Sequence, residues 1–165
     1  HKEVEVEEDC LKILALHQPV AVDLRFIVAV LKINNDLERI GDLAVNIAER
    51  TAYLIEHETV EAQYSFEAMA EKAQAMLRKS LDALVNMDAD AARAVMKADD
   101  EVDALDRDMF EHILQRLGLE SDNVVTYIHL LSISRHLERI ADLATNIAED
   151  VIYMVEGTIV RHGKK

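Results

Sequence analysis

Apolar residues recur at helical spacing in the segment around residue 40. Ile33, Leu37, Ile40, Ala44 and Ile47 stand three or four positions apart. This spacing places them on one face of an α-helix, because the helix turns once in about 3.6 residues. Most of the positions between them carry charged or amide side chains. The pattern predicts a long amphipathic helix.

The same pattern returns further along the chain, at an offset of 100 residues. The segment NNDLERIGDLAVNIAER at 34–50 matches SRHLERIADLATNIAED at 134–150 at both apolar and polar positions. Helical composition alone does not produce so extended a match, so the sequence predicts a tandem duplication. The apolar face of the second copy consists of Ile133, Leu137, Ile140, Ala144 and Ile147.

The first copy lies in a long predicted helix. Pro19 is placed to open this helix, because proline is favoured in the first helical turn, and the pattern continues to about Glu56. Gly41 lies inside the helix, where glycine costs about 1 kcal/mol relative to alanine. Its equivalent in the second copy is Ala141, and helix packing is favoured over function as the reason for this glycine.

The second half of the chain is predicted to contain three helices. Residues 65–87 and 89–117 form two of them, with a turn and a helix cap where they meet. The third helix carries the second copy and runs to about Glu156. Ser121 and Asp122 offer N-caps for it.

Upstream of the first copy, only one short helix, 4–17, is recognisable, where a duplicated bundle would place two. The sequence therefore predicts an all-α protein formed by tandem duplication of three-helix bundles, with the first bundle N-terminally truncated in this chain. The predicted domains are 1–60 for the first, partial bundle and 61–165 for the second.

Composition and charge narrow the classes of protein and partner. Half of the residues are apolar, and one proline and four glycines suit long helices with few turns rather than strand-rich folds. The formal net charge of −14 opposes direct binding to nucleic acid or to an anionic membrane surface. Cations and basic partner proteins are favoured instead.

No apolar run is long enough to form a transmembrane segment. The best candidate, residues 26–31, is stopped by Lys32. No secretory signal is visible, and the lone cysteine, Cys10, fits a reducing compartment. We therefore expect a cytoplasmic protein.

Pairs of acidic residues four positions apart are the candidate chemistry. Carboxylates at this spacing share one face of a helix and repel each other by a few tenths of a kcal/mol unless a cation lies between them. On a helical projection they fall on the outside or at the edge of the bundle. If helix 89–117 packs beside the second copy, four carboxylates converge. The pairs are Glu38 with Asp42, Asp99 with Asp103, and Glu138 with Asp142.

Oxygen-rich ligand sets of this kind suit hard cations. Magnesium, manganese, calcium and iron accept carboxylate ligands, whereas zinc and copper(I) prefer imidazole and thiolate. We predict that these six carboxylates bind hard metal cations (iron, magnesium or manganese). A solvated acidic face, with surface ion pairs to Arg39 and Arg139, is the alternative interpretation.

No constellation typical of an enzyme accompanies these carboxylates. The seven histidines form neither an HExxH pattern nor the Glu-x-x-His pattern of di-iron bundles. The sequence also contains no Gly-rich phosphate loop, nucleophile elbow or CxxC motif. We therefore expect a protein that is not an enzyme.

Three segments carry a resemblance to a known family. LERIGD at 37–42, LERIAD at 137–142 and QPVAVDLR at 18–25 resemble the PhoU family, and the resemblance covers essentially the whole chain. It implies bundles of three helices whose acidic motifs, at the pairs given above, bind multinuclear metal clusters. The family pattern also places a fourth acidic pair just upstream of Val4.

The resemblance further implies a function in phosphate signalling. A PhoU-like protein is expected to act as a negative regulator of phosphate uptake and of the phosphate-starvation response. Its expected partners are the ATPase of a phosphate ABC transporter and the sensor histidine kinase PhoR. Family members often form homodimers.

Other functions stay open at this point. A carboxylate-bridged metalloenzyme, such as a phosphatase or oxidase, would use paired metals, but di-iron enzymes hold their ligands inside the bundle. An accessory protein of another inorganic phosphate transporter would have a similar helical character. A purely structural helical scaffold with solvated acidic faces is the third alternative.

Overall fold

The computed structural model describes residues 2–57, 66–117 and 123–160, and its regular elements within these ranges are α-helices. The predicted all-α class is thereby confirmed. In chain order the helices are α1 (Lys2–His17), α2 (Ala21–Glu56), α3 (Phe66–Asn86), α4 (Ala89–Leu117) and α5 (Val124–Glu156).

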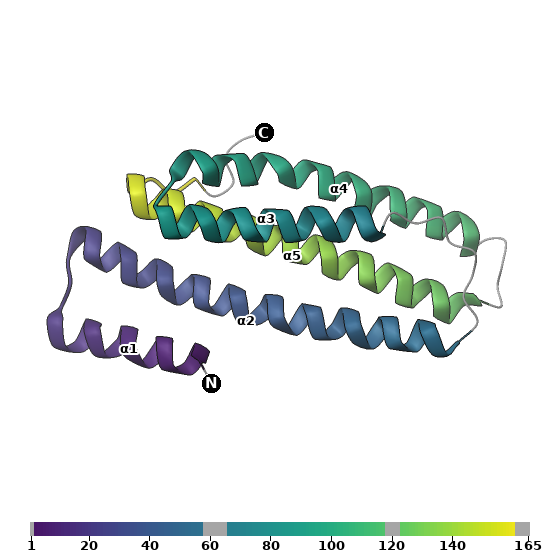
Figure 1. The fold of residues 1–165 in the computed structure, drawn as a ribbon, viewed down its shortest axis with the longest axis horizontal. Helices are drawn as coiled ribbons and strands as arrows, with labels where there is room; N and C mark the ends of the chain where they lie inside the picture. The colour runs from purple at the N-terminus through teal and green to yellow at the C-terminus, as the bar shows by residue number, and fades with distance from the viewer. Residues whose placement is uncertain (1, 58–65, 118–122, 161–165) are drawn as a thin grey trace.

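α5 is the central helix of the arrangement (Figure 1). It packs against α2 and against the α3–α4 hairpin, while α1 packs along α2. α2 and α5 run in opposite directions. An early residue of α2, Lys32, pairs with Asp150 late in α5, whereas the ring of Tyr53, late in α2, stacks on that of His129, early in α5. The two copies of the repeated segment therefore face each other in antiparallel order.

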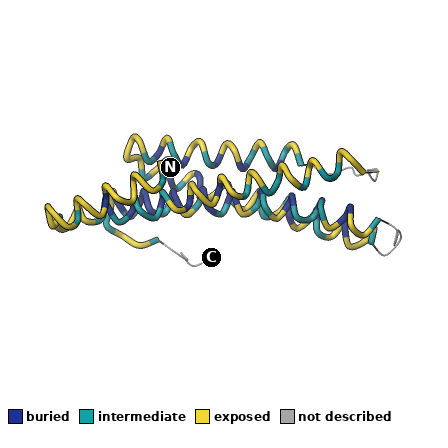
Figure 2. The backbone as a smooth tube through the Cα atoms, turned by 90° about the horizontal axis from the view of Figure 1, so that it is seen from below, coloured by how far each residue is buried: buried dark blue, intermediate teal, exposed yellow. Residues whose placement is uncertain are grey.

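The largest buried face belongs to α5. Its apolar residues at the repeated positions, from Ile133 to Ile147, are at most 8% exposed. Met69 and Met76 of α3 and Val95 of α4 belong to the same core. Figure 2 shows the buried residues concentrated where the long helices meet, with exposed residues along the outer surfaces. The apolar periodicity of the sequence thus marks the core-facing side of α5.

The first copy of the repeat is packed less completely than the second. Leu37 on α2 is 38% exposed, whereas the equivalent Leu137 on α5 is 7% exposed. Ala44 is likewise exposed where Ala144 is fully buried. α5 lies beneath both α3 and α4, whereas α2 packs chiefly against α1 and α5. The two copies of the repeated segment therefore have different surroundings in the structure.

Gly41 shows the same openness of α2. A methyl group at this position would meet no heavy atom within 4 Å beyond the backbone of its own helix and its chain neighbours. The expectation that helix packing explains this glycine is therefore wrong for the described part of the chain. An alanine fits there as it does at Ala141.

The turn between α3 and α4 is capped by a side chain. Met87 adopts a positive φ of 52°, which reverses the chain direction. Asp88 Oδ1 then accepts hydrogen bonds from the backbone N–H groups of Asp90 at 3.0 Å and Ala91 at 2.9 Å. These contacts satisfy N–H groups that the first turn of a helix leaves free, and they confirm the predicted cap.

The starts of the two long helices differ from the expectation. α2 begins at Ala21 after an extended N-cap residue, Val20, so Pro19 precedes the helix instead of occupying its first turn. Ser121 and Asp122 lie outside the described residues. The N-cap of α5 is Asn123, which makes no side-chain cap hydrogen bond.

Two expectations concern the chain as a whole. Within the described ranges, no helix is both long enough and apolar enough to cross a bilayer. The boundary between domains 1–60 and 61–165 falls in the segment 58–65, outside the described residues, and stays a prediction.

Candidate metal-binding site

Four of the predicted carboxylates meet where α4 packs against α5. Asp99 and Asp103 lie one turn apart on α4, and Glu138 and Asp142 lie one turn apart on α5. All four side chains are half-buried, which places them at the edge between the two helices. The sequence predicted that these four carboxylates converge if the two helices pack side by side, and the two helices do so. We refer to these four residues as the acidic cluster.

The pKa of Asp99 reflects how close these charges are. It is raised from 3.8 to about 6, first because burial disfavours the charged form and then because Asp103 and Asp142 repel it. Asp103 lies on the same helix as Asp99, whereas Asp142 belongs to α5. The repulsion therefore acts across the contact between the helices.

The carboxyl groups on α5 show the same effect. The pKa of Glu138 is raised from 4.5 to about 7, first by burial and then by repulsion from Asp142, Asp106 and Asp103. The pKa of Asp142 is raised by burial and by Asp103. Neighbouring arginines on α5 offset these shifts in part. The fold thus leaves negative charge in the acidic cluster only partly compensated.

A further acidic residue, Asp106, lies directly beside the cluster. It is 6% exposed, and its Oδ1 accepts a hydrogen bond from Ser134 Oγ at 2.7 Å. Its Oδ2 lies 3.3 Å from Arg135 Nη1 in an ion pair. With Asp103, Glu138 and Arg135 it lines a pocket of about 250 Å³ on the outer side of the α4–α5 contact.

The sequence analysis did not identify Asp106 as a site residue. Its position gave a signal, because it follows Asp103 by three residues and so continues the acidic row by one helical turn. Its partners, Ser134 and Arg135, lie on α5 and become neighbours only through tertiary packing. The hydrogen bond and the ion pair hold the side chain of Asp106 in place beside the acidic cluster.

The first-half pair is placed differently. Glu38 and Asp42 on α2 are exposed, and neither is among the charges that shift the pKa values of the acidic cluster. Glu3 stands at the position equivalent to Asp103, because the two copies of the repeat are 100 residues apart. This relation can be read from the sequence. Asn34 Nδ2 donates a hydrogen bond to the Glu3 backbone oxygen at 2.9 Å and holds the start of α1 against α2.

The donor chemistry of the acidic cluster fits a hard cation. Carboxylate oxygens from two helices, with pKa values raised by mutual repulsion, would be stabilised by a cation that displaces their protons. In the observed side-chain arrangement, no three carboxylate, imidazole or thiol groups of the described residues stand close enough to share one ion. A coordination shell therefore requires rotation of side chains on α4 and α5.

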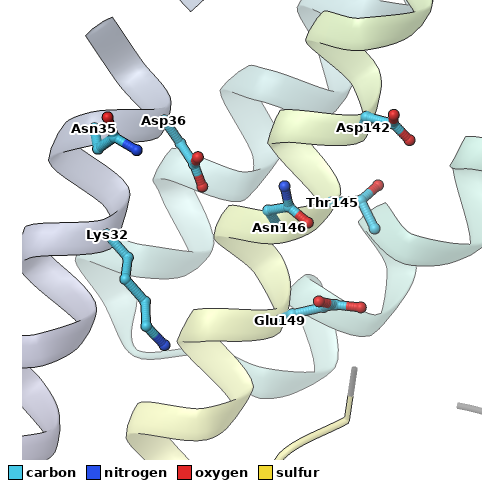
Figure 3. Close-up of a pocket in the computed structure, with 7 residues that line it drawn as sticks. All are labelled: Lys32, Asn35, Asp36, Asp142, Thr145, Asn146 and Glu149. Carbon is cyan, nitrogen blue, oxygen red and sulfur yellow. The ribbon is translucent and has the colours of Figure 1, made fainter. Parts of the chain in front are cut away.

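A polar pocket continues the cluster towards α2 (Figure 3). It has a volume of about 510 Å³ and lies between α2 and α5. Asp142 contributes to both the pocket and the acidic cluster, so the two are continuous. The pocket is lined by Lys32, Asn35, Asp36, Asp142, Thr145, Asn146 and Glu149.

The fold and this site define a class of protein, the helical-bundle proteins with acidic motifs at their helix edges. A family model described as the PhoU domain matches residues 1–51 and 66–151. The chain belongs to the PhoU family.

Named relatives agree with this assignment. The chain is 39% identical over 160 residues to the "Phosphate-specific transport system accessory protein PhoU homolog" of Aquifex aeolicus, covering 97% of this chain and 72% of the relative. It is 37% identical over 158 residues to the protein of the same name from Pseudomonas aeruginosa, covering 95% of this chain and 65% of the relative. The chain thus spans roughly two thirds of the length of these relatives.

Two crystal structures share the fold. PhoU from Pseudomonas aeruginosa superposes with a TM-score of 0.90 at 36% identity, covering 94% of this chain and 75% of that one. The phosphate transport system regulatory protein PhoU from Streptococcus pneumoniae superposes with a TM-score of 0.84 at 31% identity, covering 96% and 74%. The predicted PhoU-like fold is confirmed.

Proposed function

We propose that this chain acts as a regulatory adaptor of phosphate transport. It would restrain phosphate uptake and the phosphate-starvation response by linking the ATPase of a phosphate ABC transporter to its sensor histidine kinase. The names of the relatives, accessory and regulatory proteins of phosphate transport, support this role. The proposal includes a cytoplasmic location and a homodimer, and it assigns no enzymatic reaction.

The adaptor is proposed to bind one or more hard metal cations (iron, magnesium or manganese) at the acidic cluster. The observation that carries this proposal is the repulsion between carboxylates across the α4–α5 contact, where Asp142 faces Asp99 and Asp103. Asp103 also repels Glu138. Glu38 and Asp42 are proposed as a second, more exposed set on α2.

A bound cation would supply positive charge at the point where two helices present like charges. The side chains of Asp99 and Glu138 would give up their protons and turn towards a common centre between α4 and α5. Repulsion between the helices would then become attraction. The resulting change in charge and helix spacing is the signal that we propose a partner protein reads.

Metal content is the measurement that tests the site. After exchange against a weak chelator, the wild-type protein is expected to retain a hard cation in elemental analysis. The Glu138→Ala/Asp142→Ala double variant is expected to lose the cation bound at the acidic cluster, because half of the ligand set is absent, and to retain only the cation bound by Glu38 and Asp42. The Glu38→Ala/Asp42→Ala double variant, with equal loss of charge, is the control and should retain cation at the acidic cluster.

Equal and negligible metal in wild type and both variants would overturn the metal-binding part. The regulatory part is measured with the same proteins in cells that lack their own PhoU, through a phosphate-starvation reporter. We expect wild type to lower reporter activity in high phosphate and the Glu138→Ala/Asp142→Ala variant to leave it high. A reporter that responds to none of the proteins would contradict the regulatory role.

A further inference from the structure

The two ends of the α2–α5 contact differ in charge. At one end, Lys32 Nζ on α2 donates a hydrogen bond to Asp150 Oδ1 on α5 at 3.2 Å. Because α2 and α5 carry copies of one segment in antiparallel order, the equivalent residues at the other end are Ser132 and Arg50. An arginine thus stands in place of the carboxylate, and a serine in place of the lysine. Among the described residues, the second end therefore has a cation without the matching anion.

At this end, Arg50 has an enclosed N–H group without an acceptor in the described part of the chain. The side chain is half-buried, and its Nε has neither accessible surface nor a hydrogen-bond partner. No carboxylate in the described ranges forms an ion pair with it. A buried N–H without an acceptor costs stability, more so when the group is charged. An anion from solution would remove this cost.

A second group without a hydrogen-bond partner lies beside Arg50. His129 Nδ1 on α5 is enclosed and makes no hydrogen bond. The pKa of His129 is lowered first by burial and then by the positive charges of Arg50 and His57. Burial and Arg50 also lower the pKa of His136, which faces Arg50 from α5. The charged neighbours that act on His129 among the described residues are therefore cationic.

Ring stacking holds His129 in place. The ring of Tyr53 on α2 lies between those of His57 and His129, with centroid distances of 3.9 Å on each side and interplanar angles of 13° and 17°. His57 Nδ1 donates a hydrogen bond to the Tyr53 backbone oxygen at 2.8 Å, which orients the outer ring. The imidazole of His129 is thus positioned before any ligand arrives.

We propose that Arg50 and His129 form a binding site for a small tetrahedral oxyanion of the phosphate or sulfate class. The planar guanidinium matches two oxygens of such an anion, and the imidazole Nδ1 offers another donor. Both side chains keep part of their surface exposed, and rotation of the Arg50 side chain would open Nε and His129 Nδ1, which are enclosed in this structure, to an anion from solvent. Neither residue belongs to the acidic cluster, and the site does not depend on metal binding there.

Binding at this site takes up a proton. An anion between Arg50 and His129 stabilises the protonated imidazole and raises its pKa from the lowered value. By linkage, the anion binds more tightly as pH falls through the pKa of His129. The groups that face this ring are Arg50, Tyr53 and His57 from α2, and His136 from α5.

Sulfate is the probe of choice, because its charge stays constant over the range in which histidine titrates. The pKa of His129 is measured by NMR of the imidazole protons in sulfate and in chloride of equal ionic strength. We expect sulfate to raise it in the wild-type protein. Arg50→Gln should abolish the rise and weaken sulfate binding about tenfold in calorimetry. Inorganic phosphate should compete with sulfate.

Arg39→Gln is the matched control, because it removes an exposed arginine from the same helix, and it should keep the rise. His129→Gln keeps Arg50 and should bind sulfate with little dependence on pH, which tests the site even if Arg50→Gln fails to fold. Equal pKa values of His129 in sulfate and chloride would overturn the proposal. So would an undiminished rise in Arg50→Gln, or phosphate that does not compete.

Discussion

The carboxyl groups of Asp99 and Glu138 titrate far from their ordinary range. Their pKa values are raised to about 6 and about 7, above the values of 3.8 and 4.5 expected in an unfolded chain. The folded protein therefore binds more protons than the unfolded chain between these limits. In the absence of a cation, its stability falls as pH rises through this range, because the clustered carboxylates become charged.

Glu138→Gln tests this directly. The variant keeps the shape of the side chain and removes its charge, so the metal-free protein should be more stable at neutral pH by on the order of 1 kcal/mol. The full value of the pKa shift is not expected, since the cluster is part-exposed and water screens it. Urea unfolding in the presence of a chelator, at several pH values between about 4 and 8, measures both the gain and the flatter pH profile.

Glu38→Gln provides the comparison for that experiment. Its carboxylate is exposed on α2, so the same chemical change should alter the free energy of unfolding by less than about 0.5 kcal/mol. A gain as large as that of Glu138→Gln would mean that net charge, and not the acidic cluster, determines the pH dependence.

Sequence reasoning predicted some residues of the candidate sites and missed others for a physical reason. Asp99 and Asp103 were found because their spacing on one helix is visible in the sequence. Asp106, His129 and Arg50 were missed, because the residues that they face lie on other helices. A helix period fixes which side chains share a face, but only the crossing of two helices decides which faces meet.

Among the elements, α4 has the clearest start. Asp88 accepts two backbone hydrogen bonds in its first turn, directly after the positive φ of Met87. The carboxylate also carries negative charge at the helix N-terminus, where the helix dipole favours it. α4 carries half of the acidic cluster. By fixing the first residue of the helix, this cap also helps to determine which face of α4 carries Asp99 and Asp103.

Asp88→Ala is expected to destabilise the protein by about 1 kcal/mol, because two N–H groups lose their acceptor. Thermal unfolding followed by circular dichroism measures the effect. Asp88→Asn retains the acceptor oxygen and should recover most of the loss, whereas Asp82→Ala, which removes an exposed acid on α3, should cost little. An Asn variant as unstable as the Ala variant would contradict a capping role.

The extent of the helices was largely predictable from the sequence, because it depends on local periodicity. The predicted segment 89–117 agrees with α4, and the second repeat continues to Glu156 as expected. Starts were harder. Pro19 precedes the N-cap of α2, because a helix can begin after a proline as well as with it.

In the molecule as a whole, the two copies of the repeated segment have different surroundings. Leu137 is part of the core formed with α3 and α4, whereas Leu37, at the equivalent position of the first copy, is 38% exposed. The duplication was evident from the sequence. The unequal packing was not, because it depends on which other helices cover each copy.

Leucine-to-alanine substitutions at the two positions should differ in cost. Leu137→Ala is expected to lower the free energy of unfolding by about 3 kcal/mol, because it leaves a cavity in the core. Leu37→Ala is expected to lower it by less than about 1 kcal/mol. Denaturant unfolding of both variants provides the measurement. Equal losses would mean that Leu37 is covered in solution.

α5 contains neither proline nor glycine along its 33 residues, so it has none of the usual places for a kink. At about 1.5 Å per residue it is a rod of roughly 50 Å. Glu138 lies near its middle, His129 towards one end and Asp150 towards the other. A tilt of this helix at Glu138 would therefore displace both of its ends at once.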